Sequence, residues 1–129
     1  MCTRPITKDG KTFSCRTCDQ CIATRRAGWI ARAMAEKAEW PHTLCVALTY
    51  NNDTQENRDA AAMFNYSDVR AFMKRLQRAS SYKKPGSRVR FICAGEQGDR
   101  NGRCHWHLIL YSDLDLTTLG EISGVVGSR

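Results

Sequence analysis

Residues 89–111 read VRFICAGEQGDRNGRCHWHLILY, two apolar runs on either side of a polar turn. The runs at 89–94 and 105–111 are short and rich in aliphatic and aromatic residues, a composition typical of buried strands. Between them, residues 99–102 read DRNG, and an Asn-Gly pair is a strong hairpin-turn signal. The stretch therefore predicts two antiparallel strands, the first of which ends at Gly95-Glu96.

Three side chains of this hairpin form a candidate metal site. Alternate side chains of a strand point to the same face, so His105 and His107 present two imidazoles side by side. Glu96, at the end of the partner strand, is close enough in register to add a carboxylate oxygen. Mixed nitrogen and oxygen ligands with open coordination positions suit a catalytic Mg²⁺ or Mn²⁺. Taken alone, a His-x-His pair can equally be half-buried and hydrogen-bonded without any metal.

The remaining elements are expected from hydrophobic periodicity and end signals. Trp40-Pro41 should end a first helix, and the alternation of apolar and basic residues after Ser67, its expected N-cap, predicts a basic amphipathic helix. The expected ranges are a helix at 22–39, a buried strand at 43–50, a short helical turn at 58–63 within a polar connection, and a helix-like tail at 116–122. Together with the hairpin, they predict an α+β fold.

Seven cysteines in a chain without a signal-like N-terminus indicate metal or redox chemistry rather than a disulfide framework. Cys15, Cys18 and Cys21 form a C-x2-C-x2-C run, and the polar loop at 8–11 contains a Gly suited to folding Cys2 back toward it. Four thiolates favour a structural Zn²⁺. An iron-sulfur cluster and free or redox-active thiols are the alternatives. Cys45 and Cys93 lie inside apolar runs and are expected to be small buried side chains.

The charge of the chain favours polyanionic partners, because 20 basic and 13 acidic residues give a net charge of +7. The basic faces either contact phosphates or are simply solvated. The candidate nucleic-acid contacts are Arg25, Arg26, Lys74, Arg78, Lys83, Lys84, Arg88 and Arg90. No apolar run approaches the roughly 20 residues of a membrane helix, so no membrane partner is expected and a reducing cytoplasm is the expected compartment.

The stretch FICAGEQG at 91–98, the basic loop after it, and RCHWHLIL at 103–110 together resemble the HUH motif of microvirus-type replication initiators. The cysteine cluster with its Arg-rich helix and the strand VALTY at 46–50 resemble the same family in the same order. The resemblance covers about residues 2–111. It implies a ferredoxin-like or RRM-like antiparallel sheet with helices on one side, and a location in the cytoplasm of a bacterial host. A division into a Cys-rich segment at 1–24 and an HUH-like domain at 25–129 is expected.

The activity implied by this resemblance is metal-dependent transesterification of single-stranded DNA in rolling-circle replication. A tyrosine hydroxyl would attack the scissile phosphate, leaving a 5′ phosphotyrosyl link and a free 3′ hydroxyl. The family places this tyrosine on a helix downstream of the HUH strand, and no Tyr follows Tyr111 here. Tyr50 and Tyr111 remain as candidates, although neither matches the motif.

Three interpretations therefore stay open. The chain is part of a longer nickase, or a short enzyme that uses an unexpected tyrosine or a partner's tyrosine. Alternatively, it is an inactive scaffold that binds nucleic acid or protein as a phage-encoded regulator or inhibitor of a host replication or nucleoprotein complex.

Overall fold

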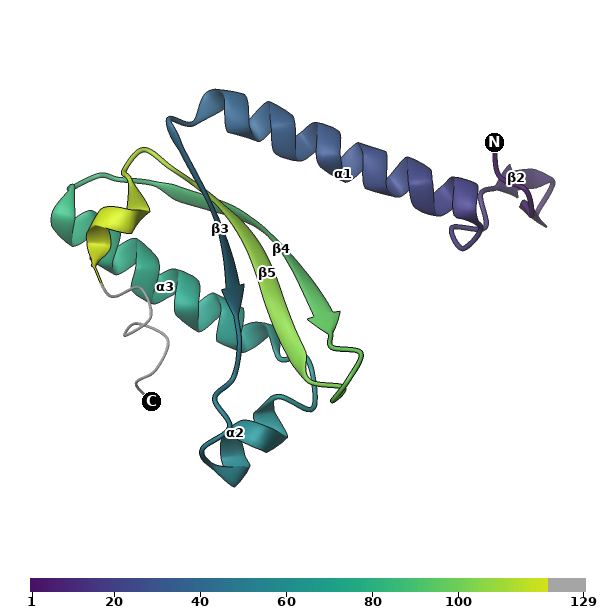
Figure 1. Ribbon diagram of the computed structural model, residues 1–129. Coiled ribbons are helices and arrows are strands. Elements are labelled where there is room, and N and C mark those ends of the chain that lie inside the picture. Colours follow the sequence, from purple (N-terminus) through teal and green to yellow (C-terminus); the bar gives the residue numbers. More distant parts are fainter. Residues whose placement is uncertain (121–129) are drawn as a thin grey trace. The chain divides into compact units, whose positions relative to one another are not determined.

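The computed structural model describes residues 1–120 and divides the chain into two compact units, residues 1–38 and residues 39–129. Each unit is described separately below, with the elements labelled in Figure 1. The boundary expected between residues 24 and 25 falls inside a continuous helix, and the separate functional segment expected at 1–24 stays a prediction. Within residues 1–120, no helix combines the length and apolar character needed to cross a membrane.

The first unit consists of a small hairpin and a long helix. Strands β1 (Ile6–Lys8) and β2 (Lys11–Phe13) pair antiparallel, with Lys8 opposite Lys11. The two turn residues, Asp9 and Gly10, both have positive φ, as a tight two-residue hairpin turn requires. Helix α1 (Asp19–Glu39) starts three residues earlier than expected and ends before Trp40-Pro41, as the sequence predicts. None of its residues is fully buried.

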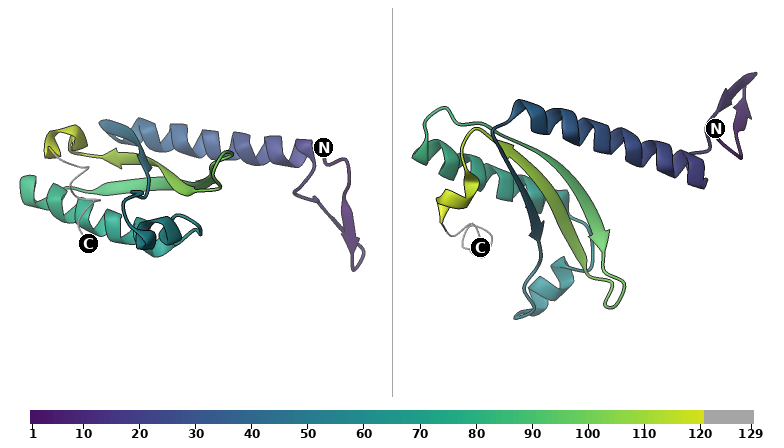
Figure 2. Two further views of the ribbon diagram at one scale, coloured as in Figure 1. Left: turned by 60° about the horizontal axis from the view of Figure 1, so that its bottom comes forward. Right: turned by 45° about the horizontal axis from the view of Figure 1, so that its top comes forward.

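The second unit is an α+β sandwich of one sheet and one long helix, visible in Figure 1 and in the left view of Figure 2. Its sheet has the order β3-β5-β4, and both pairings are antiparallel. These observations confirm the predicted α+β class and the predicted hairpin, whereas the ferredoxin-like or RRM-like arrangement stays a prediction. The element bounds are β3 (His42–Leu48), α2 (Gln55–Ala60), α3 (Tyr66–Lys83), β4 (Val89–Gln97), β5 (Cys104–Ser112) and a 3-10 helix η1 (Leu116–Leu119).

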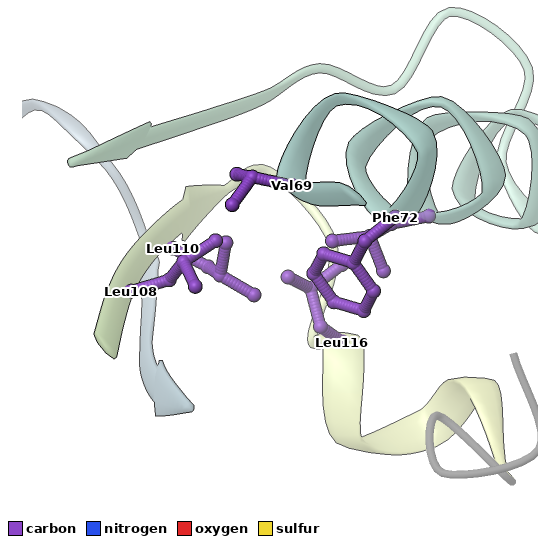
Figure 3. Close-up of a cluster of buried hydrophobic side chains, with 6 residues drawn as sticks. Val69, Phe72, Leu108, Leu110 and Leu116 are labelled. Carbon is purple, nitrogen blue, oxygen red and sulfur yellow. The ribbon is translucent and has the colours of Figure 1, made fainter. Parts of the chain in front are cut away.

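The core lies between α3 and one face of the sheet. Figure 3 shows Val69 and Phe72 of α3 directed toward Leu108 and Leu110 of β5, with Leu116 of η1 closing the cluster. Because side chains alternate along β5, this packing leaves His105 and His107 on the opposite face. The burial of the core therefore fixes which face of the sheet carries the candidate metal ligands.

Several expected boundaries are wrong by two or three residues. β3 ends at Leu48 rather than at residue 50, and β4 continues to Gln97, past Gly95-Glu96. The N-cap of α3 is Asn65, whose side chain accepts a hydrogen bond from the Ser67 N–H, so the helix begins before Ser67. Helix α2 lies at 55–60 instead of 58–63, because Thr54 caps it.

Two further expectations concern single regions. Cys45 is exposed rather than buried, because it lies on the face of β3 that α3 does not cover. Of the helix-like tail expected at 116–122, η1 accounts for residues 116–119, and residues 121–129 lie outside the described part of the chain.

Candidate metal centre

The β4–β5 hairpin brings three candidate ligands together on one face of the sheet. Glu96 pairs with His105 in the register, and Ala94 pairs with His107, so Glu96 and the two imidazoles occupy neighbouring positions on the same face. Their ligating atoms all lie within 4.8 Å of one another. The predicted combination of Glu96, His105 and His107 is therefore assembled by strand register alone.

Glu96 is hydrogen-bonded to both imidazoles. Its Oε2 lies 3.1 Å from His105 Nε2 and 2.5 Å from His107 Nε2. The hydrogen bond with His107, followed by that with His105, lowers the pKa of the Glu96 carboxyl from its usual value. Glu96 is thus held as a carboxylate, which is the form that binds a cation.

The geometry fits an ion with few protein ligands. Adjacent ligands of an octahedral Mg²⁺ at about 2.1 Å are about 3.0 Å apart, close to the Glu96–His105 separation. The Glu96–His107 contact must open by about 0.5 Å to admit an ion at that bond length. The Glu96 side chain is 60% exposed, so this movement meets little packing resistance. Three ligands on an open surface leave coordination positions for water or a phosphate oxygen.

The surroundings of the site keep it accessible. His107 lies between Ala47 of β3 and Ala94 of β4 in the register of the sheet, and both alanines are exposed. A methyl group on each side leaves the imidazole face open, where larger residues would cover it. The sequence contains both alanines, but their position beside His107 depends on β3 pairing with β5, which the hairpin pattern did not predict.

A second group of candidate ligands lies in the first unit, where Cys2, Cys15, Cys18 and Cys21 have sulfur atoms within 4.8 Å of one another. The backbone N–H of Cys15 donates to Cys2 Sγ, and that of Cys18 donates to Cys15 Sγ, each at 3.3 Å. All four predicted ligands are therefore brought together, including Cys2 beside the first residue.

The thiols of this cluster differ in acidity. Hydrogen bonds from the side chain and backbone of Thr3 lower the pKa of Cys18 to about 5. Backbone hydrogen bonds from Thr17 and Cys18 lower the pKa of Cys15 to about 7. Burial instead raises the pKa of Cys21 to about 11. Part of the cluster thus favours the thiolate even without a cation.

The two tyrosine candidates are both engaged in the fold. Tyr50 lies two residues beyond β3, where its hydroxyl donates to the Asp68 carboxylate and its carbonyl accepts from Arg103 at 2.6 Å. Tyr111 shares the face of the histidines but is only 1% exposed. Four residues separate it from His107, about 13 Å along the strand. Neither hydroxyl is placed beside the candidate ligands.

The predicted basic contacts do not gather around Glu96 and the histidines. Lys74 and Arg78 are exposed on α3, which covers the opposite face. Lys83, Lys84 and Arg88 lie at the far end of the sheet, about 23 Å from Glu96 along β4. There Lys83 donates to the Thr118 carbonyl, Lys84 to the Asp113 carbonyl, and Arg88 pairs with the Asp113 carboxylate. Arg90 shares the histidine face by alternation, six residues before Glu96.

Arg25 and Arg26 belong to α1 in the more basic of the two units. Residues 1–38 contain eight basic and three acidic residues, a net charge of +5, whereas residues 39–129 contain twelve and ten, a net charge of +2. Most of the excess positive charge therefore lies in the first unit.

Two arginines that the sequence interpretation left out lie in the hairpin loop beside the candidate ligands. Arg100 is exposed in the turn between Gln97 and Cys104. Arg103 reaches back to the Tyr50 carbonyl and the Asn52 side chain, so it ties this loop to the segment after β3. Their position inside the metal-site hairpin could have singled them out, because the loop follows Glu96 directly.

Comparisons with known proteins agree with this geometry. Residues 43–124 match the family of replication-associated protein ORF2. The replication-associated protein ORF4 of Chlamydia phage 1 is 33% identical over 97 residues, which are 75% of this chain and 23% of the relative. The replication-associated protein VP4 of Bdellovibrio phage phiMH2K is 25% identical over 103 residues, 78% of this chain and 31% of the relative.

This chain thus spans less than a third of the length of either relative. No solved structure matches. The matched region contains the whole β3–α2–α3–β4–β5 unit, with Glu96, His105 and His107 inside it, and the chain belongs to the family of replication-associated protein ORF2.

Proposed function

We propose that this chain carries the metal-binding part of an HUH-type endonuclease that nicks single-stranded DNA to start rolling-circle replication of a phage genome. The observation that carries the proposal is the convergence of Glu96, His105 and His107 on an exposed face of the sheet. The family membership supports the same assignment.

In this proposal the protein holds a divalent cation and leaves room for the DNA. Mg²⁺ or Mn²⁺ at this site would polarise the scissile phosphate and stabilise the charge that develops on it. The imidazoles act as neutral ligands and Glu96 as the charged one. Ala47 and Ala94 leave space on both sides of His107 for the phosphate to approach. Arg100, in the adjoining loop, contributes positive charge toward the DNA backbone.

The reaction transfers a phosphodiester rather than hydrolysing it. A tyrosine oxygen forms a bond to the scissile phosphorus while the bond to the 3′ oxygen breaks, which yields a 5′ phosphotyrosyl link and a free 3′ hydroxyl. Because one ester replaces another, the link retains the free energy needed for later rejoining. Tyr50 and Tyr111 are unsuited to this attack, since one is held by Asp68 and the other is buried. We propose that the attacking tyrosine lies outside these 129 residues.

The same observation favours a second function. With Tyr50 and Tyr111 both engaged, the chain by itself would bind single-stranded DNA in a metal-dependent manner without cleaving it. Such a protein would act as a nucleic-acid-binding regulator. Glu96, His105 and His107 would still be needed, because they form the DNA-facing site in both cases.

Incubation with labelled single-stranded DNA that spans a phage replication origin, with and without Mn²⁺, tests both functions. We expect Mn²⁺ to strengthen binding to the wild-type chain and to have no such effect on a His105→Ala/His107→Ala variant. His42→Ala is the matched control, because it removes an exposed imidazole at the other end of the sheet.

A denaturing gel then separates the outcomes. A covalent adduct in the wild type alone would show that an attacking tyrosine is present in this chain. Metal-dependent binding without an adduct would support the binding function. Binding that is independent of both the metal and the two histidines would refute an HUH site.

A further inference from the structure

The first unit holds little that could stabilise its N-terminal half. All residues of β1 and β2 are exposed, and two-stranded hairpins are marginally stable in water. Between residues 1 and 17, only the two cysteines are even partly buried. A segment with so few apolar contacts needs a crosslink to keep one conformation.

We infer that residues 1–38 form a zinc-dependent folding unit, in which Cys2, Cys15, Cys18 and Cys21 bind one Zn²⁺. The inference does not depend on the nickase proposal, because no residue of the β4–β5 hairpin takes part. It concerns a structural ion, enclosed by four thiolates and with no open position for substrate.

The sulfur geometry fits a tetrahedral site. At a Zn–S distance of about 2.3 Å, neighbouring sulfurs of a tetrahedron lie about 3.8 Å apart. Cys2 Sγ and Cys18 Sγ are 3.9 Å apart, and no pair in the cluster exceeds 4.8 Å. At 3.9 Å these two sulfurs are also far beyond disulfide bonding distance. The N–H groups of Cys15 and Cys18 donate to cluster sulfurs, and such hydrogen bonds stabilise negative charge on a metal-bound thiolate.

The cluster also joins the hairpin to the long helix. The Cys18 carbonyl accepts from the Ile22 N–H and so begins the first turn of α1, which contains Cys21. Cys2 precedes the hairpin and Cys15 follows it, so an ion held by all four closes a loop around β1 and β2. Arg25 of α1 adds a second link by donating to the Arg16 carbonyl at 2.6 Å. The metal would therefore determine the structure of the hairpin and the start of the helix together.

The test begins with the metal content of the full chain, purified under reducing conditions without a chelator. We expect one zinc per chain in the wild type and in the His105→Ala/His107→Ala variant, which separates this site from the sheet site. Cys2→Ser and Cys18→Ser should lose the zinc. Cys45→Ser, which changes an exposed cysteine of β3, is the matched control and should keep it.

Hydrogen exchange then tests the folding claim. Removal of zinc with a chelator should speed exchange in residues 6–22 at least tenfold, while β4 and β5 keep their protection. Absence of bound zinc, iron with acid-labile sulfide in its place, zinc that survives Cys18→Ser, or unchanged exchange after chelation would each overturn the inference.

Discussion

Replacement of Glu96 by Gln removes one negative charge from the sheet site with little change in side-chain volume. Coulomb's law gives about 4 kcal/mol for a carboxylate and a divalent cation about 2.1 Å apart in a medium as polar as water. Water is the appropriate limit because the Glu96 side chain is 60% exposed. The Gln amide oxygen remains a dipolar ligand and recovers part of this energy. We therefore expect a net loss of about 2 kcal/mol, or about 30-fold in the Kd for Mn²⁺.

Titration of Mn²⁺ by isothermal calorimetry measures this change directly, and Asp99→Asn is the matched control. Asp99 lies in the same hairpin, so its replacement removes the same charge without removing a ligand. The thermal midpoint of Glu96→Gln should stay close to that of the wild type, since exposed ion pairs contribute at most about 1 kcal/mol. Equal Mn²⁺ affinities for Glu96→Gln and Asp99→Asn would refute the role of Glu96 as a ligand.

Three other changes test the surrounding structure. Phe72→Ala should lower the free energy of unfolding by about 3–5 kcal/mol in urea titrations, because the ring is 1% exposed in the core. Arg103→Ala should speed hydrogen exchange in residues 50–57, which lose the arginine's contacts to Tyr50 and Asn52, and unchanged exchange would contradict this link. Hydrogen bonds from Thr117 lower the pKa of Asp115 in the folded state, so its stabilising effect is present above the unfolded pKa of about 4 and is lost as pH falls through the folded value. In Asp115→Ala, the acid-induced loss of stability should accordingly be smaller than in the wild type.

The hairpin and its metal ligands could be predicted from sequence because both depend on local pattern. An Asn-Gly turn fixes which residues face each other, and alternation then places Glu96 beside His105. The cysteine cluster was equally accessible, since three of its members lie within one short run. In both cases the chain between the ligands is short enough for spacing to determine geometry.

The surroundings of the site could not be predicted in the same way. Arg103 contacts Asn52 across 51 residues, and no local pattern reports such a contact. Cys45 lies in an apolar run, which indicates a strand but not that α3 covers only one of its faces. Asn65 and Ser67 are both good N-cap residues, so sequence alone does not rank them. The basic residues were counted correctly, yet their distribution over two units and two faces depends on the fold.

The two candidate metal sites differ in the kind of cation that they favour. Four thiolates select a soft or borderline ion such as Zn²⁺, whereas two imidazoles and a carboxylate on an open surface accept Mg²⁺ or Mn²⁺ and leave positions for a substrate. Each set of ligands lies entirely within one of the two units. Loss of zinc should therefore leave Mn²⁺ binding intact, and loss of Glu96 or the histidines should leave zinc in place. Because of this separation, a structural ion in one unit and a catalytic ion in the other can be tested independently in the same protein.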